Sequence, residues 1–166
     1  MILVNPGDFL AQAKHLAANC QTGKPLTASG LPVDVRTSIS RAYYAAHLIA
    51  RQTLFSIGFS LPSTGKCHAE VPDALTNSGN RDLMNVASKL KTLCTNRRKA
   101  DYDITDSVVE DVQMADDMCV MSDAIIAKLR FVIAKSSEDM AYKDMMVKVI
   151  SNWISQHPEV GIRPKK

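Results

Sequence analysis

Two charged residues interrupt an apolar stripe near the middle of the chain, and their types and spacing suit phosphate chemistry. Four apolar residues with helical spacing form the stripe: Leu83, Ala87, Leu90 and Cys94. The next two positions of the same stripe are Arg97 and Asp101. Residues four apart lie on one side of a helix, so these opposite charges can pair. The pattern predicts either an ion pair that fixes the helix end or a guanidinium that faces a cleft and binds phosphate.

A second polar group lies on the preceding long helix. Arg41, Tyr44, His47 and Arg51 follow one another at steps of three, three and four residues, which predicts that they share one flank. A histidine there is either packed or a proton acceptor. Aromatic residues make up only 5% of the chain, so the adjacent pair Tyr43 and Tyr44 is informative. These rings are either core residues or stack on a base or on a dimer partner.

The charges are unevenly distributed although the net charge is only +3. A stretch from Lys89 to Lys99 carries five basic residues and no acid, and eight acidic residues follow between Asp101 and Asp123. Such runs are either solvated faces that neutralise each other or a local patch that attracts phosphate. The end of the basic stretch contains Arg97 and Arg98, which are therefore candidate phosphate ligands.

Helices must position these residues. The chain has 166 residues, of which 46% are apolar, and few glycines or aromatic residues, which favours an all-α fold over a β-sandwich or barrel. Caps and apolar periodicity predict helices over residues 6–19, 32–57, 69–76, 81–103, 108–133 and 140–155. Thr105 is the expected cap of the fifth helix, and residues 161–166 are expected to fray.

These elements predict an antiparallel up-down four-helix bundle over residues 1–135, with a short extra helix. Residues 136–166 are expected to form a C-terminal helix and tail that belong to the same domain. The whole chain has the length of one domain.

Neither a metal nor a cofactor is expected. Cys20, Cys67, Cys94 and Cys119 form no CxxC pair and are interpreted as small buried side chains. The histidines are likewise too dispersed along the chain to suggest a metal site. No apolar run approaches the roughly 18 residues of a membrane span, and the first residues lack the basic and apolar regions of a signal peptide. A cytoplasmic protein without membrane contact is the expectation.

Two sequence motifs resemble the HEPN domain family. They are Ile39-Ser40-Arg41-Ala42-Tyr43-Tyr44-Ala45-Ala46 and, after the small helix, Arg97-Arg98-Lys99-Ala100-Asp101-Tyr102-Asp103. The chain is similar to the branch with an SRAYYA second helix and an R…ADYD end to the third helix, over residues 5–135. The resemblance implies an antiparallel helical bundle that forms a homodimer with a cleft between the subunits.

The resemblance also implies a function in RNA or nucleotide binding, in a toxin–antitoxin or phage-defence setting. In that reading Arg97 and Arg98 bind phosphate and Asp101 orients Arg97, while other residues line the cleft: Tyr44, Tyr102, His47 and Arg41.

Alternative functions stay open because the chain departs from the motif of the family's metal-independent ribonucleases. That motif has an Arg followed by a His. In this chain four residues separate Arg97 from Tyr102, and Tyr102 occupies the position of the His. A phenol is a poor proton acceptor near neutral pH. One alternative is a ribonuclease toxin with an altered active site, in which Arg97 and Tyr102 are catalytic. Another is a subunit that docks a small nucleotidyltransferase or an antitoxin, with the Met-rich C-terminal helix as contact surface.

Overall fold

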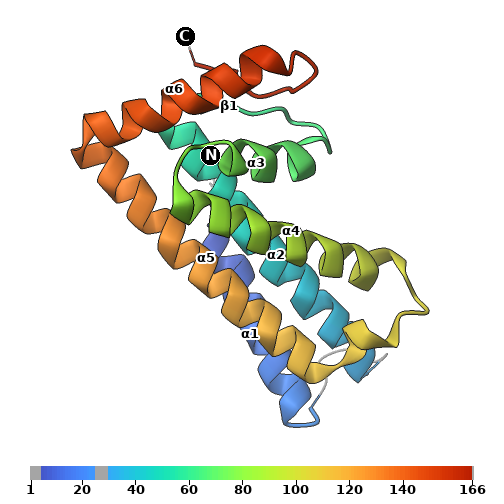
Figure 1. Cartoon of the computed structure of the whole chain (residues 1–166). Helices are drawn as coiled ribbons and strands as arrows, with labels where there is room; N and C mark the ends of the chain where they lie inside the picture. The colour runs from blue at the N-terminus through green and yellow to red at the C-terminus, as the bar shows by residue number, and fades with distance from the viewer. Residues whose placement is uncertain (1–4, 25–29, 166) are drawn as a thin grey trace. The chain divides into compact units, whose positions relative to one another are not determined.

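Helices dominate the structure, as the sequence predicts. The computed structural model describes residues 5–24 and 30–165, and 79% of these residues are helical. Six α-helices make up most of this fraction. They are α1 (Pro6–Gln21), α2 (Leu31–Ile57), α3 (Cys67–Thr76), α4 (Arg81–Tyr102), α5 (Val112–Glu138) and α6 (Met140–Gln156) (Figure 1). The all-α prediction is confirmed. Within the described residues, no helix combines the length and the apolar character that crossing a membrane requires.

Side-chain caps explain where several helices begin. Asn5 accepts a hydrogen bond from the Gly7 backbone N–H, and Pro6 occupies the first helical position of α1. Asn80 accepts bonds from the first backbone N–H groups of α4, and Asp139 accepts one from α6. Helix α2 ends at Ile57, and the next residue, Gly58, has a φ of 116°, a conformation that favours glycine. The expected connection at residues 22–30 lies partly outside the described residues.

The chain divides into two compact units. Unit 1 comprises described residues 5–24, 30–46 and 92–124, and unit 2 comprises residues 47–91 and 125–165. Each unit therefore takes part of α2, α4 and α5.

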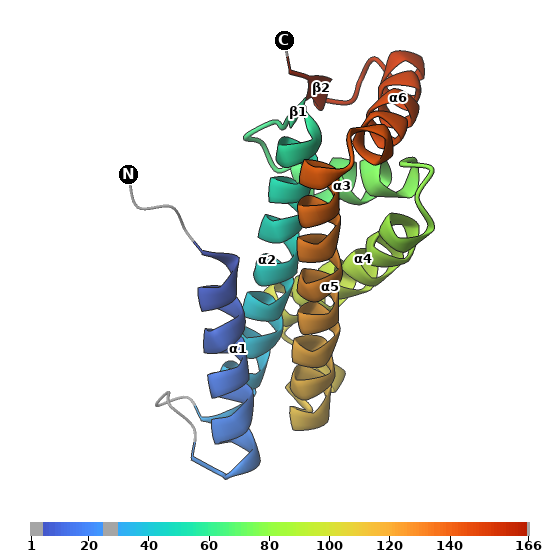
Figure 2. The same ribbon diagram turned by 90° about the vertical axis from the view of Figure 1, so that its left-hand side faces the viewer.

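Hydrogen bonds and ion pairs join the helices of unit 1 around a buried core. The first part of α2 lies beside α1 in Figure 1 and Figure 2, where the buried Ser38 hydroxyl donates to the Ala13 carbonyl at 2.9 Å. The buried Ser122 hydroxyl of α5 donates to the Ala42 carbonyl of α2 at 2.7 Å. Lys14 of α1 pairs with Asp123 of α5. The described core side chains include Leu10, Ile39, Tyr43, Leu93, Ala115 and Cys119.

Unit 2 contains a short antiparallel ribbon of two strands. Strand β1 (Phe59–Ser60) pairs with β2 (Arg163–Pro164), and α6 contacts both β2 and α3. Buried Glu70 of α3 accepts the Gly161 backbone N–H at 2.9 Å, and Ile162 is fully buried. The expectation that residues 161–166 fray is therefore wrong for the segment through Pro164, while Lys166 lies outside the described residues.

The start of α5 also differs from the prediction. Thr105 caps no helix, because its own N–H and hydroxyl donate to the Asp103 carboxylate. Residues Ser107–Glu110 form a separate 3₁₀ turn, η1, and α5 begins only after Asp111, whose carboxylate accepts the Gln113 N–H. Val108, where the predicted helix over residues 108–133 starts, accordingly lies outside α5 and is 58% exposed. Short-range hydrogen bonds to the carboxylates of Asp103, Asp106 and Asp111 thus replace the predicted first turn.

Candidate functional site

Arg97 is the centre of a cluster of polar and aromatic side chains in unit 1, which we call the Arg97 site. Its Nε lies 2.6 Å from the Asp101 carboxylate, so the predicted ion pair is confirmed. Its Nη2 donates to the Tyr44 hydroxyl at 2.7 Å and to the Tyr102 hydroxyl at 3.3 Å. The guanidinium carbon also lies 5.2 Å from the Tyr44 ring centre and 5.1 Å from that of Tyr102. Arg97 is therefore held by a carboxylate and by two aromatic rings.

The surroundings of Arg97 keep it positively charged. Its side chain is only 13% exposed and that of Asp101 is 23% exposed. Burial alone would lower the pKa of Arg97, but the Asp101 carboxylate and the two tyrosines raise it above its usual value. The Nε and Nη2 atoms of the guanidinium already contact these partners. The site is thus a fixed cation with oriented phenols beside it.

A pocket next to the Arg97 site is formed by α2 and the end of α4. It measures about 400 Å³ and is lined by Val33, Arg36, Thr37, Ser40, Arg41, Tyr44, Ala100 and Asp101. The Arg41 guanidinium carbon lies 5.5 Å from the ring centre of Phe9 on α1, and Phe9 in turn contacts Tyr44. The structure thus brings Arg41 to the same group of residues as Tyr44 and Asp101, as the sequence predicts.

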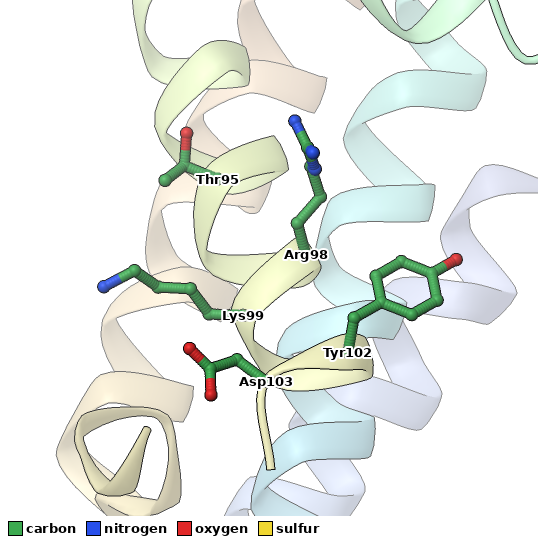
Figure 3. Close-up of a pocket in the computed structure, with 5 residues that line it drawn as sticks. All are labelled: Thr95, Arg98, Lys99, Tyr102 and Asp103. Atoms are coloured by element: carbon green, nitrogen blue, oxygen red, sulfur yellow. The ribbon is translucent and has the colours of Figure 1, made fainter. Parts of the chain in front are cut away.

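A second pocket, which is open to solvent, lies against the last two turns of α4. Figure 3 shows its lining residues, Thr95, Arg98, Lys99, Tyr102 and Asp103. Arg98 and Tyr102 extend along one flank of the helix, whereas Lys99 and Asp103 extend along the other. Lys99 pairs with Asp106 at 3.0 Å. Tyr102 is 71% exposed although it contacts Arg97, so it presents an exposed aromatic ring on the same flank of α4 as Arg98.

Arg36 is a residue of this region that the sequence analysis missed. Its Nε donates to Glu110 at 2.9 Å, and its Nη atoms donate to the carbonyls of Ala100, Asp103 and Asp106 at 2.9–3.2 Å. One side chain of α2 thereby fixes the segment that follows α4. In the sequence, the only feature that marks Arg36 is that it follows the apolar residue Val35. This signal is too weak to predict the partners of Arg36.

His47 does not join the Arg97 site. It belongs to unit 2, is 2% exposed, and contacts Cys67 and His68 of α3. The expectation that it lines a cleft with Tyr44 and Arg41 is corrected for a geometric reason. A step of three residues falls about 60° short of a full helical turn, so two such steps turn His47 about 120° away from Arg41.

Comparison of the chain with family models, with curated protein sequences and with solved structures finds no match.

Proposed function

We propose that this protein is a HEPN-like up-down helical bundle that binds RNA or a nucleotide at the end of α4. The observation that carries the proposal is the Tyr102 ring, which is 71% exposed and yet held beside Arg97. An exposed aromatic ring with a fixed orientation is a surface on which a base can stack. The Arg98 guanidinium on the same flank can bind a phosphate in bidentate geometry.

Further support comes from the link between the two motifs that resemble HEPN sequences. Tyr44 of the first motif accepts a hydrogen bond from Arg97 of the second, although 53 residues separate them. In this proposal Arg97 acts as a fixed positive charge, Asp101 and Tyr44 orient it, and Arg41 adds a second cation near the pocket on α2. His47 has no part in the site.

The proposal includes a homodimer whose cleft contains this surface. Ile104 and Val108 follow Tyr102 closely in the sequence, and they are 87% and 58% exposed. Exposed apolar residues of this size provide area for a subunit interface. Sedimentation of the full chain and of an Ile104→Asp, Val108→Asp double variant tests this part: a dimer that becomes a monomer supports the interface, and an unchanged state contradicts it.

Binding is tested by fluorescence anisotropy with labelled single-stranded RNA and with ATP, in buffer without divalent metal. Tyr102→Ala removes the stacking surface and should weaken RNA binding by about 1–3 kcal/mol, or about 5- to 160-fold. Tyr102→Phe keeps the ring and should bind like the wild type. Arg98→Ala should lower both the affinity and its salt dependence, whereas Arg130→Ala, an exposed arginine of α5, serves as control. Wild-type affinity in both Tyr102→Ala and Arg98→Ala would refute the proposed surface.

A second candidate function is metal-independent RNA cleavage, in a toxin or defence role. The specific observation is that the Tyr102 hydroxyl lies 3.3 Å from Arg97, so the two positions of the ribonuclease motif converge. Arg97 would stabilise the charge of the pentavalent phosphate. Incubation of mixed RNA with the wild type and with Arg97→Ala tests this function. Products with 2′,3′-cyclic phosphate ends from the wild type alone would support it, and intact RNA in both reactions would reject it.

A further inference from the structure

Three potential metal ligands meet in unit 2, and none of them belongs to the Arg97 site. They are His47 of α2 and the consecutive residues Cys67 and His68 at the start of α3. One nitrogen from each histidine and the cysteine sulfur all lie within 4.8 Å of one another. His47 and Cys67 are buried and His68 is half-buried, so the cluster has one ligand near solvent through which an ion can enter.

We propose that His47, Cys67 and His68 form a binding site for a divalent zinc-type cation. Imidazole nitrogen and thiolate sulfur are the ligands that Zn²⁺ prefers in proteins. A set of three protein ligands leaves a fourth tetrahedral position for water or an external ligand. The inference is independent of the RNA-binding proposal, because the two involve different residues and different units.

The distance between the two buried ligands agrees with this assignment. A tetrahedral ion about 2.3 Å from sulfur and about 2.1 Å from nitrogen holds those two atoms about 3.6 Å apart. The His47 Nε2 lies 3.6 Å from the Cys67 sulfur. The two imidazole rings have their centres 4.6 Å apart and are inclined by 32°. In this proposal the half-buried His68 ring rotates to bring its nitrogen onto the ion.

The surroundings of the sulfur are those of a thiolate ligand. Arg51, one helical turn after His47, places its Nη1 3.7 Å from the Cys67 sulfur and its Nη2 3.5 Å from the Pro62 carbonyl. Outer donors of this kind orient a metal-bound thiolate and compensate its charge. Cys67 is also the first residue of α3, where the helix dipole stabilises negative charge. A bound ion would thus connect α2 to the beginning of α3.

Cobalt provides the spectroscopic test, because tetrahedral Co²⁺ absorbs in the visible and a thiolate ligand adds a charge-transfer band in the near ultraviolet. The full chain is reduced, stripped with a chelator and titrated with Co²⁺, and Zn²⁺ is then added as competitor. We expect saturation at one ion per chain and displacement by Zn²⁺. Cys67→Ser should lose the charge-transfer band, and His68→Ala should weaken binding by about 100-fold. His68 is half-buried, so its replacement is expected to leave the fold intact, as checked by circular dichroism.

Matched controls outside the cluster are His15→Ala, on the exposed face of α1, and Cys94→Ser, on α4. Both should bind Co²⁺ like the wild type. The proposal is overturned if the wild type shows no charge-transfer band, if the band survives in Cys67→Ser, or if folded His68→Ala binds as tightly as the wild type. None of these outcomes depends on whether the protein binds RNA.

Discussion

The two tyrosines that contact Arg97 should differ sharply in their contribution to stability. Both hydroxyls accept a hydrogen bond from the same Nη2 atom, but at 2.7 Å for Tyr44 and at 3.3 Å for the largely exposed Tyr102. A hydrogen bond to a charged group in a partly buried place contributes about 1.5–3 kcal/mol, whereas a long, exposed one contributes at most about 0.5 kcal/mol. Tyr44→Phe should therefore destabilise the protein by at least about 1 kcal/mol more than Tyr102→Phe.

Urea unfolding followed by circular dichroism measures this difference. With a slope of about 2 kcal/mol per molar urea, Tyr44→Phe should lower the midpoint by about 1 M, and Tyr102→Phe by about 0.2 M. Both variants keep the aromatic ring, so stacking on Arg97 is retained in each. In an Arg97→Leu background the two changes should become nearly equivalent. Equal shifts in the presence of Arg97, or a larger shift for Tyr102→Phe, would contradict the expected difference between the two hydrogen bonds.

Two further predictions concern Arg36 and His47. Arg36→Leu should cost about 2–4 kcal/mol, because it removes the side chain that donates to Glu110 and to the carbonyls of Ala100, Asp103 and Asp106. It should also speed amide exchange over residues 103–110; an effect no larger than that of the exposed Arg81→Leu would contradict this. Burial, with the nearby charges of His68 and Arg51, lowers the pKa of His47 from 6.5 to about 3. The unfolded chain therefore binds a proton below about pH 6.5 that the folded, metal-free chain does not. Its free energy of unfolding should fall between about pH 6.5 and 3, by up to about 5 kcal/mol. Urea midpoints measured across this range should fall less steeply for His47→Gln than for the wild type, and parallel pH profiles would contradict the assignment.

Local sequence patterns were sufficient to predict most helices and part of the site. Spacing alone places six residues on one stripe of α2, and all six are buried: Val35, Ile39, Ala42, Ala46, Ile49 and Thr53. The Arg97–Asp101 ion pair also follows from spacing, because a four-residue separation on a helix fixes which side chains meet. Asn5 and Gly58 mark helix ends through their own side-chain and backbone chemistry.

Contacts between distant segments could not be predicted in the same way. The bond from Arg97 to Tyr44 spans 53 residues, the bonds of Arg36 span 63 to 74, and His47 meets Cys67 across 20. Each of these contacts depends on which helices pack together and on how each helix is rotated about its axis. The periodicity of a single segment predicts neither. The same limit applies to His47, Cys67 and His68. In the sequence they are two separate histidines and a cysteine, whereas in the structure their ligand atoms lie close together.

The bond between Glu70 and Gly161 has a consequence for how the protein is made. Its two partners are separated by 91 residues, and the β1–β2 pairing joins segments that are even farther apart in the chain. A ribosome synthesises Glu70 and β1 long before Gly161 and β2. Glu70 and β1 therefore lack these contacts while the intervening helices are synthesised. Every residue of unit 1 has been synthesised once residue 124 is added, whereas unit 2 extends to the last described residues of the chain. Unit 2 is therefore the part of the nascent chain that chaperones and proteases encounter unfinished.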